Sequence, residues 1–401
     1  MIMNKSGPLL GLKILEVGST IAGPMTATLL ADLGAEVIKI ESPKKEDTIR
    51  TWSPIKDGIS LWWKVIGRNK KLITLDLKSE EGQNIFKKLA ADVDVIIENF
   101  RPGTLEKWNI GYETLSKINS GIILLRISGF GQTGPYSKQP GYGTIAEAMS
   151  GIPSFTGFPD SPPTLSAFPL ADAVTSVFGG MSIMSAVYDR NRDDGKGQII
   201  DLSLYESMMR LVDPLIIGYD QMGIIKKRGG NRMEEDAPRN TYLTKDEHWL
   251  AISASSNQTF KRLVQAIKRP ELAEDTRFRN NPDRVKNVEE LDKIIGDWIA
   301  SKSLKEIEEI FKYYDVVAGP VYDIEDIFKD IQIKARENIV SIKDSDLNEA
   351  KVQSVVPRFS KNPGKVNHLG LKRGEHNEEV YHNTLGLSIE EIESLKQKKI
   401  I

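Results

Sequence analysis

The chain has 401 residues, with 54 Lys and Arg against 56 Asp and Glu, and it contains no Cys. This length exceeds what one hydrophobic core usually serves, so we expect two domains, and the near balance of charge argues against nucleic acid as a partner. The lack of Cys excludes disulfides, thiolate metal sites and a Cys nucleophile.

The first elements alternate between strand and helix. Residues 12–41 are expected to form a strand, a loop, a helix and a second strand, because a short apolar run is followed by Gly, Ser and Thr and then by an amphipathic stretch. Two further apolar runs at 92–100 and 121–130 are separated by helix-like sequence. This alternation predicts an α/β fold with a parallel sheet covered on both faces.

Loops rich in Gly, Pro and polar side chains follow three of these strands, at 18–24, 98–107 and 128–143. The carboxyl ends of parallel strands meet at one edge of a sheet, so these loops are expected to line one crevice. The first loop lacks the G-x-G-x-x-G pattern, which argues against a nicotinamide dinucleotide site. Most of the nearby basic residues are expected at the solvated surface, although a few could meet the phosphates of a nucleotide-like ligand: Lys44, Lys45, Arg50, Arg68, Lys70, Lys71 and Lys78.

The composition changes near residue 225. Residues 226–240 are polar and rich in Gly and charge, which is typical of a domain boundary. Beyond them, residues 241–253 are expected to form a hairpin, and residues 288–300 and 303–314 have the apolar spacing of amphipathic helices.

The reactive residues available in the first part of the chain are restricted, because the first of the four His is His248. Acid–base chemistry before that position must use carboxylates, Tyr or Lys. No metal site is predicted, since no HExxH or similar spacing occurs. No apolar run is recognised as a membrane span and the N-terminal residues lack the apolar part of a signal peptide, so we expect a cytoplasmic protein that does not act at a membrane.

One carboxylate, Asp172, lies in the apolar stretch "FPLADAVTSVFGG" at the start of an expected helix. Asp is a favoured N-cap residue, so a purely structural cap is one interpretation. The alternative is a covalent nucleophile, which the free N–H groups and the dipole of the helix would keep ionised and oriented.

Several segments together resemble the family III CoA-transferases: "AGPMTATLLADLGAEVIKIE", "TLDLKSEEG", "ENFRPGTLEKWNIGYE", "ISGFGQTGPY", the Asp172 segment and "KGQIIDLSLYESM". The resemblance extends in order over nearly the whole chain. It implies an interlocked homodimer with a Rossmann-like large domain at 1–225, a smaller α+β domain at 226–330, and a C-terminal segment at 331–401 that returns to the large domain.

The resemblance also implies a reaction. Asp172 is then the nucleophile, and we expect it to be the N-cap of its helix as well, since the two roles are compatible. CoA passes from an acyl-CoA donor to a carboxylic acid acceptor through a mixed anhydride and an aspartyl-CoA thioester. CoA is a substrate, and no cofactor is implied. The family pattern places the CoA site at Ile21, Ala22, Leu75, Asp76, Leu77, Lys78, Asn99, Phe100, Arg101, Lys107 and Tyr142.

Two alternatives stay open. The related alpha-methylacyl-CoA racemases use a His where this chain has Tyr142, and a phenol with a pKa near ~10 is a poor base at neutral pH. A protein that binds acyl-CoA without turnover is the other alternative.

Two residues depart from the family pattern. Ser42 replaces a basic residue of some members, so Lys44 or Lys45 could supply that contact, and Gly143 replaces an acidic one.

Overall fold

The computed structural model describes residues 6–401. The chain clusters into two compact units. The large unit contains the chain up to Ile152, Leu165–Gln221 and Lys334–Ile401, and the small unit contains Pro153–Thr164 and Met222–Ile333. Residues 153–164 thus cluster with the small unit, although the sequence analysis placed them in the large domain.

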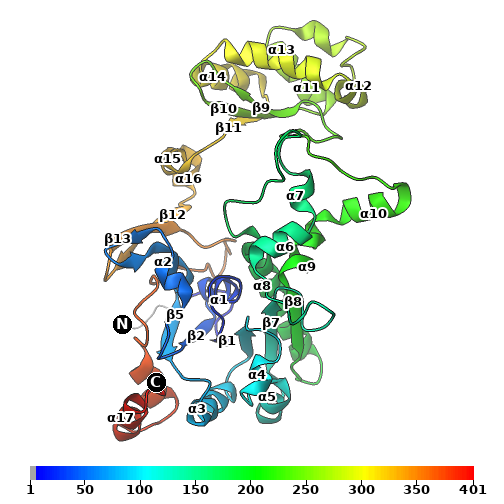
Figure 1. Cartoon of the computed structure of the whole chain (residues 1–401). Helices are drawn as coiled ribbons and strands as arrows, with labels where there is room; N and C mark the ends of the chain where they lie inside the picture. The colour runs from blue at the N-terminus through cyan, green and yellow to red at the C-terminus, as the bar shows by residue number, and fades with distance from the viewer. Residues whose placement is uncertain (1–5) are drawn as a thin grey trace. The chain divides into compact units, whose positions relative to one another are not determined.

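A six-stranded sheet forms the centre of the large unit (Figure 1). Every strand pair in it is parallel, and Ile14 pairs with Val37 on one side and Val95 on the other. The predicted α/β fold with a parallel sheet is therefore confirmed. In order across the sheet, the strands are β5 (Lys70–Thr74), β2 (Glu36–Glu41), β1 (Lys13–Glu16), β6 (Val95–Glu98), β7 (Ile123–Ser128) and β8 (Ile199–Ser203).

Helices cover both faces of this sheet because successive residues of a strand point to opposite sides. Leu15 belongs to a core that also contains residues of α3 (Glu80–Ala90), α5 (Tyr112–Ile118) and α17 (Ile389–Gln397). Its neighbour Ile14 belongs to the second core, with α1 (Ala22–Asp32) and α8 (Leu170–Arg192). The apolar runs of the sequence form strands that are buried on both faces.

Helix α8 is the longest helix among the described residues, and it corrects the expectation that no segment is apolar and long enough to span a membrane. By length and composition alone it could cross a membrane, because an 18-residue window has a mean hydropathy of 1.4. The sequence analysis had recognised no such run. Within the large unit, Ala171 and Ile183 of α8 lie in the second core, and Gly179 lies against Thr26 of α1. The apolar composition of α8 thus serves, in part, to cover the sheet.

The C-terminal part of the chain covers the β5 edge of the sheet. The Leu72 N–H donates to Nδ1 of His376 at 3.0 Å, and the Thr74 N–H donates to Oδ1 of Asn377 at 2.9 Å. Side chains thereby satisfy an edge strand that would otherwise expose its N–H groups. The Asp76 N–H also donates to the Ile400 carbonyl at 2.7 Å, so the end of the chain holds the segment that follows β5.

The small unit contains an antiparallel sheet in the order β11 (Ala318–Pro320), β10 (Trp249–Ser253) and β9 (Arg239–Leu243). The predicted hairpin is confirmed as β9 and β10. The two predicted helices are confirmed as α13 (Val288–Ala300) and α14 (Leu304–Tyr314), which pack with α11 (Asn257–Ala266) around one core.

The remaining elements are short. They are η1 (Thr48–Thr51), β3 (Ile55–Lys56), β4 (Ile59–Ser60), α2 (Leu61–Ile66), α4 (Thr104–Lys107), α6 (Gly143–Met149), α7 (Ile152–Phe155), α9 (Leu204–Met209), η2 (Arg210–Val212), α10 (Asp213–Met222), η3 (Pro270–Ala273), α12 (Asn281–Lys286), α15 (Ile324–Lys329), α16 (Ile331–Ala335), β12 (Ile339–Asp344), β13 (Asn348–Gln353) and η4 (Glu379–Thr384).

Candidate active site

Two adjoining cavities lie at the carboxyl ends of the strands in the large unit. The larger one, which we call the Asp172 cavity, has a volume of about 850 Å³ and is lined by the loops after β1, β6 and β7 and by the start of α8. The smaller one, which we call the Leu75 cavity, has a volume of about 270 Å³ and lies at the ends of β1, β2 and β5. Ser19, Thr48 and Phe100 line both cavities. An extended ligand could therefore occupy both at once.

The loop after β1 is fixed to the loop after β6. Oδ1 of Asn99 accepts a hydrogen bond from the Ser19 N–H, and Nδ2 of Asn99 donates to the Ser19 carbonyl, both at 2.8 Å. A β-carbon on Gly18 would lie 2.9 Å from Oδ1 of Asn99. Glycine at this position thus permits the close approach on which the pair depends.

Asp172 lies in the first turn of α8 and lines the Asp172 cavity. The prediction that Asp172 is the N-cap is wrong, because Pro169 occupies the N-cap position and makes no side-chain capping hydrogen bond. Asp172 is instead the third helical residue. The backbone N–H groups of Asp172 itself and of Ala22, the first residue of α1, lie beside this carboxylate and favour its ionised form. The first turns of α1 and α8 therefore meet at this carboxylate.

Burial decides the ionisation of Asp172. It raises the pKa of the carboxyl to about 6, although the N–H groups of Asp172 and Ala22 act in the opposite direction. The expected helix effect, which favours the ionised form, is thus outweighed by desolvation. The group is still mostly ionised at neutral pH but poorly hydrated, which are the properties expected of a carboxylate nucleophile.

Ten of the predicted CoA-site residues line one of the two cavities. Ile21, Ala22, Asn99, Arg101 and Tyr142 line the Asp172 cavity, Leu75, Asp76, Leu77 and Lys78 line the Leu75 cavity, and Phe100 lines both. Lys107 is exposed on α4 and lines neither. The structure thus brings the predicted residues together, and their contacts with CoA stay a prediction.

Two of the basic residues expected at the solvated surface are buried in ion pairs. Lys70 pairs with Glu16 at 3.0 Å, and Arg68 pairs with Asp32. Lys44 pairs with Asp76 at 2.6 Å. Such partners lie far apart in the sequence, so a count of charges could not reveal them. Lys45 and Lys78 do line the Leu75 cavity.

An aromatic cluster that was not predicted from the sequence lies beside the Asp172 cavity. Trp62 stacks on Phe168 with ring centroids 5.9 Å apart, and Trp52 meets Trp62 edge to face at the same distance. Trp52 and Phe168 line the cavity. The three aromatic residues within positions 52–63 were the available signal, but nothing local indicated which of them face a ligand.

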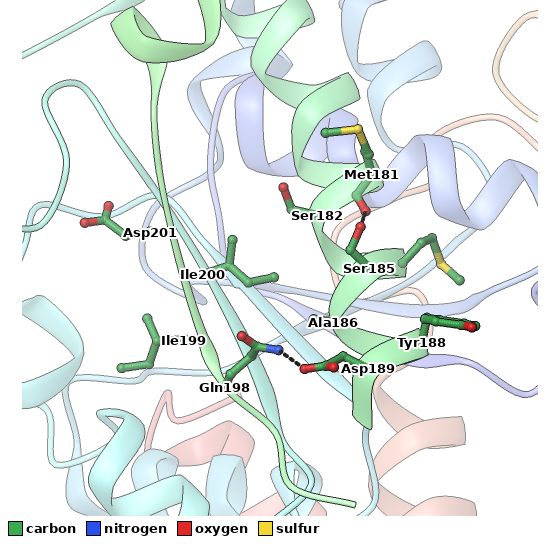
Figure 2. Close-up of a pocket in the computed structure, with 11 residues that line it drawn as sticks. Met181, Ser182, Ser185, Ala186, Tyr188, Asp189, Gln198, Ile199, Ile200 and Asp201 are labelled. Atoms are coloured by element: carbon green, nitrogen blue, oxygen red, sulfur yellow. Dashed lines mark hydrogen bonds between the residues drawn. The ribbon is translucent and has the colours of Figure 1, made fainter. Parts of the chain in front are cut away.

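A further groove lies between α8 and β8 (Figure 2) and has a volume of about 930 Å³. Figure 2 shows Met181 and Tyr188 of α8 on one side of it and Ile199 and Ile200 of β8 on the other. Both of its carboxylate-bearing residues, Asp189 and Asp201, are exposed. Because only a desolvated carboxylate has the properties described for Asp172, the Asp172 cavity is the better candidate for catalysis.

The fold and the site define the class of this protein. A parallel α/β sheet, a two-part cavity at the carboxyl ends of its strands and a desolvated carboxylate within it form an enzyme-type site for an extended small molecule. The family model described as CoA-transferase family III matches residues 9–377. The chain belongs to this family and is a CoA-transferase, as the resemblance implied.

Named relatives agree with this assignment. The chain is 42% identical over 395 residues to a succinyl-CoA–D-citramalate CoA-transferase of Chloroflexus aurantiacus, covering 98% of each chain. It is 40% identical to the beta subunit of a succinyl-CoA–L-malate CoA-transferase of the same organism, also over 98% of each. A CaiB/BaiF family protein from Brucella suis has the same fold, with a TM-score of 0.83 and 34% identity over 94% of this chain and 99% of that one.

Proposed function

We propose that this enzyme transfers CoA from succinyl-CoA to a small carboxylic acid, with Asp172 as the nucleophile. The observation that carries the proposal is the desolvated Asp172 carboxylate in the Asp172 cavity, in a chain that contains no Cys and no His before His248. The choice of donor is supported by the relatives from Chloroflexus, whose names specify succinyl-CoA. Citramalate and malate in those names make a hydroxy-dicarboxylic acid the first acceptor to test.

The proposed reaction proceeds by acyl transfers in which each bond broken is matched by one formed. The Asp172 carboxylate attacks the thioester carbonyl carbon, and CoA leaves as a thiolate, which gives a mixed anhydride. The thiolate then attacks the Asp172 carbonyl carbon, releases the donor acid and forms an aspartyl-CoA thioester. The acceptor carboxylate then attacks the Asp172 carbonyl carbon and displaces the thiolate, which gives a second mixed anhydride. The thiolate attacks the acceptor carbonyl carbon of this anhydride, which forms the CoA thioester of the acceptor and restores the Asp172 carboxylate. No cofactor is required, and exclusion of water protects each intermediate.

CoA is proposed to extend through both cavities. The Leu75 cavity has apolar walls, including Leu75, Leu77 and Phe100, that suit a nucleobase, and the rings of Phe100 and Trp108 meet edge to face at 5.2 Å. Lys45 and Lys78 line this cavity and could meet phosphates. The pantetheine arm would pass Ser19 and Thr48, which line both cavities, and present the thioester to Asp172.

The proposed assembly is the interlocked homodimer. The single chain exposes large apolar side chains where it joins the two units: Met222 is 75% exposed, Ile225 72% and Ile331 83%. Helices α10 and α16 contain no buried residue at all. Such surfaces usually mark an interface. A relative named as a beta subunit makes a second, different chain the alternative. Sedimentation of the purified chain distinguishes them, because a homodimer forms without any added partner.

The test of the proposed function combines turnover with trapping. Purified enzyme is incubated with succinyl-CoA and candidate acids, CoA exchange is followed by mass spectrometry, and hydroxylamine is added during turnover. We expect the modification on the peptide that contains Asp172 and a loss of transfer by several orders of magnitude in Asp172→Asn. An Asn variant that stays active, after deamidation to Asp has been ruled out, would contradict the assignment. Deuterium exchange at the alpha carbon without transfer would indicate a racemase instead.

A further inference from the structure

Thr20 adopts an unfavourable backbone conformation in the turn that leads to the active site. Its φ is +67°, in the left-handed region that β-branched residues rarely occupy, so this conformation costs free energy that neighbouring groups must offset. Two residues later, the Ala22 N–H acts on the Asp172 carboxylate and favours its ionised form. The Ser176 hydroxyl ties the two residues together, because it donates to the Ala22 carbonyl at 2.9 Å and to the Asp172 carbonyl at 2.7 Å. The direction of the Ala22 N–H therefore depends on the conformation of a turn that Thr20 would not adopt by itself.

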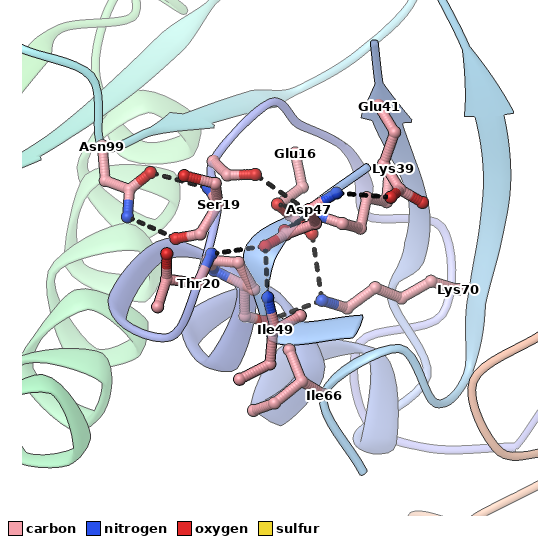
Figure 3. Close-up of polar contacts among 12 residues, drawn as sticks. Glu16, Ser19, Thr20, Lys39, Glu41, Asp47, Ile49, Ile66, Lys70 and Asn99 are labelled. Carbon is pink, nitrogen blue, oxygen red and sulfur yellow. Dashed lines mark hydrogen bonds and ion pairs between the residues drawn. The ribbon is translucent and has the colours of Figure 1, made fainter. Parts of the chain in front are cut away.

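Asp47 supplies the contact that holds Thr20. Oδ1 of Asp47 accepts hydrogen bonds from the Thr20 N–H at 3.0 Å and from the Ile49 N–H at 3.1 Å (Figure 3). The second bond makes Asp47 the N-cap of η1, so its side chain is fixed by an element outside the turn. The hydroxyl oxygens of Thr20 and Thr48 also lie 3.2 Å apart. Two neighbours at the start of η1 thus hold the Thr20 main chain and side chain.

A buried group of charges fixes Asp47 in turn. Nζ of Lys39 lies 3.1 Å from Oδ2 of Asp47 and 2.9 Å from Oε1 of Glu16, and it donates to the Gly18 carbonyl at 2.9 Å. Nζ of Lys70 lies 3.0 Å from the other oxygen of Glu16. Figure 3 shows these side chains converging beside the turn. Burial alone would raise the pKa of Asp47, but Lys39 and the N–H groups lower it, so Asp47 accepts hydrogen bonds as an anion.

We propose that Asp47 is a positioning residue of the transfer reaction. By holding Thr20 in the left-handed conformation, it places the Ala22 N–H against the carboxylate of Asp172. This inference rests on the proposed role of Asp172 as the nucleophile. The competing interpretation is that Asp47 only balances the charge of Lys39, which already has Glu16 as a partner.

A rescue experiment separates the two interpretations. Four enzymes are compared: wild type, Asp47→Ala, Thr20→Gly and the double variant. Glycine adopts a positive φ without strain, so it needs no hydrogen bond to hold the turn. We expect Asp47→Ala to lower kcat by about 10- to 100-fold relative to wild type, whereas the same substitution in the Thr20→Gly background should lower it far less relative to Thr20→Gly alone. Hydrogen exchange of the peptide spanning residues 18–22 should increase in Asp47→Ala.

Asp32→Ala provides the matched control. Asp32 is another buried carboxylate of the large unit, but it is held by Arg68 and Asn69 at the end of α1, and its loss should not be rescued by Thr20→Gly. If Asp47→Ala does not fold, the same comparison is made with Asp47→Leu, which fills the space of the side chain but offers no oxygen to accept the Thr20 N–H. Full kcat in the folded Asp47 variant, or a loss that Thr20→Gly does not restore, would overturn the inference. A wild type without transfer activity, or an active Asp172→Asn, would instead overturn the proposed function.

Discussion

Gly143 and Asp172 lie so close that no side chain fits between them: a β-carbon on Gly143 would be 2.2 Å from Oδ2 of Asp172. Gly143 is the first residue of α6, and this helix lies beside the start of α8 in the second core. Glycine at position 143, where many family members have an acidic residue, thus has a physical reason in this chain. An acidic residue at position 143 would require Asp172 to adopt another rotamer.

The variant Gly143→Ala is therefore expected to displace the Asp172 carboxylate. We expect it to fold and bind CoA, because the new methyl group meets only the end of one side chain, but to lose transfer by at least ~10-fold. Steady-state kinetics and CoA calorimetry measure the two effects. Gly296→Ala is the control, since its β-carbon would meet Tyr242 at an ordinary 3.6 Å. Equal activity of both variants would show that the carboxylate has room to move.

The pH dependence of kcat/KM should report the ionisation of Asp172. With a pKa raised to about 6 by burial, the carboxyl is ionised above that pH and protonated below it. We expect kcat/KM to fall about tenfold per pH unit below about pH 6. A profile that stays level down to about pH 4.5, with a substrate whose own acid groups do not titrate there, would contradict the role of this carboxyl as nucleophile.

Asp172 is also expected to lower the stability of the enzyme at neutral pH. Because its pKa is raised on folding, the folded state binds the proton more tightly than the unfolded state, and stability falls as pH rises from the unfolded value of 3.8 to about 6. Asp172→Asn should therefore increase the free energy of unfolding by about 1–2 kcal/mol above pH 6, after allowance for partial exposure.

Urea unfolding at two pH values checks this prediction. The increase in the free energy of unfolding that Asp172→Asn gives over wild type should disappear at about pH 4, where the wild-type carboxyl is protonated in the folded state. A residue that acted mainly as an N-cap would give little change on substitution by Asn at either pH, because Asn is itself a good cap. The structure, with Pro169 at the N-cap position, predicts the pH-dependent result.

The two lysines assigned to CoA by the family pattern can be ranked. Lys78 lines the Leu75 cavity, whereas Lys107 lies outside both cavities. We expect Lys78→Ala to weaken CoA binding by about 1.5–3 kcal/mol, as for a hydrogen bond to a charged group, with a smaller effect at high salt. Lys107→Ala should weaken it less, and Lys88→Ala serves as the surface control. Calorimetry that gave the larger loss for Lys107 would place the phosphates over α4 instead.

The class of the fold and the place of the site could both be predicted from the amino-acid sequence. Apolar runs such as residues 92–100 and 121–130 indicate strands buried on both faces, because hydrophobic periodicity is a local property of the chain. The loops after them had to meet at one edge of the sheet, since parallel strands share a direction. The family motifs then singled out Asp172 among the many carboxylates.

The contacts that hold the Asp172 carboxylate could not be predicted from the sequence. Residues near Asp172 in the sequence suggested a cap, but the partners that matter, Ala22 and Gly143, come from other helices. The charge of Asp47 is likewise balanced by Lys39, which Glu16 holds from a neighbouring strand. Hydrogen bonds and ion pairs depend on distances of about 3 Å between groups far apart in the chain, and only the folded arrangement of α1, α6 and α8 brings such groups together.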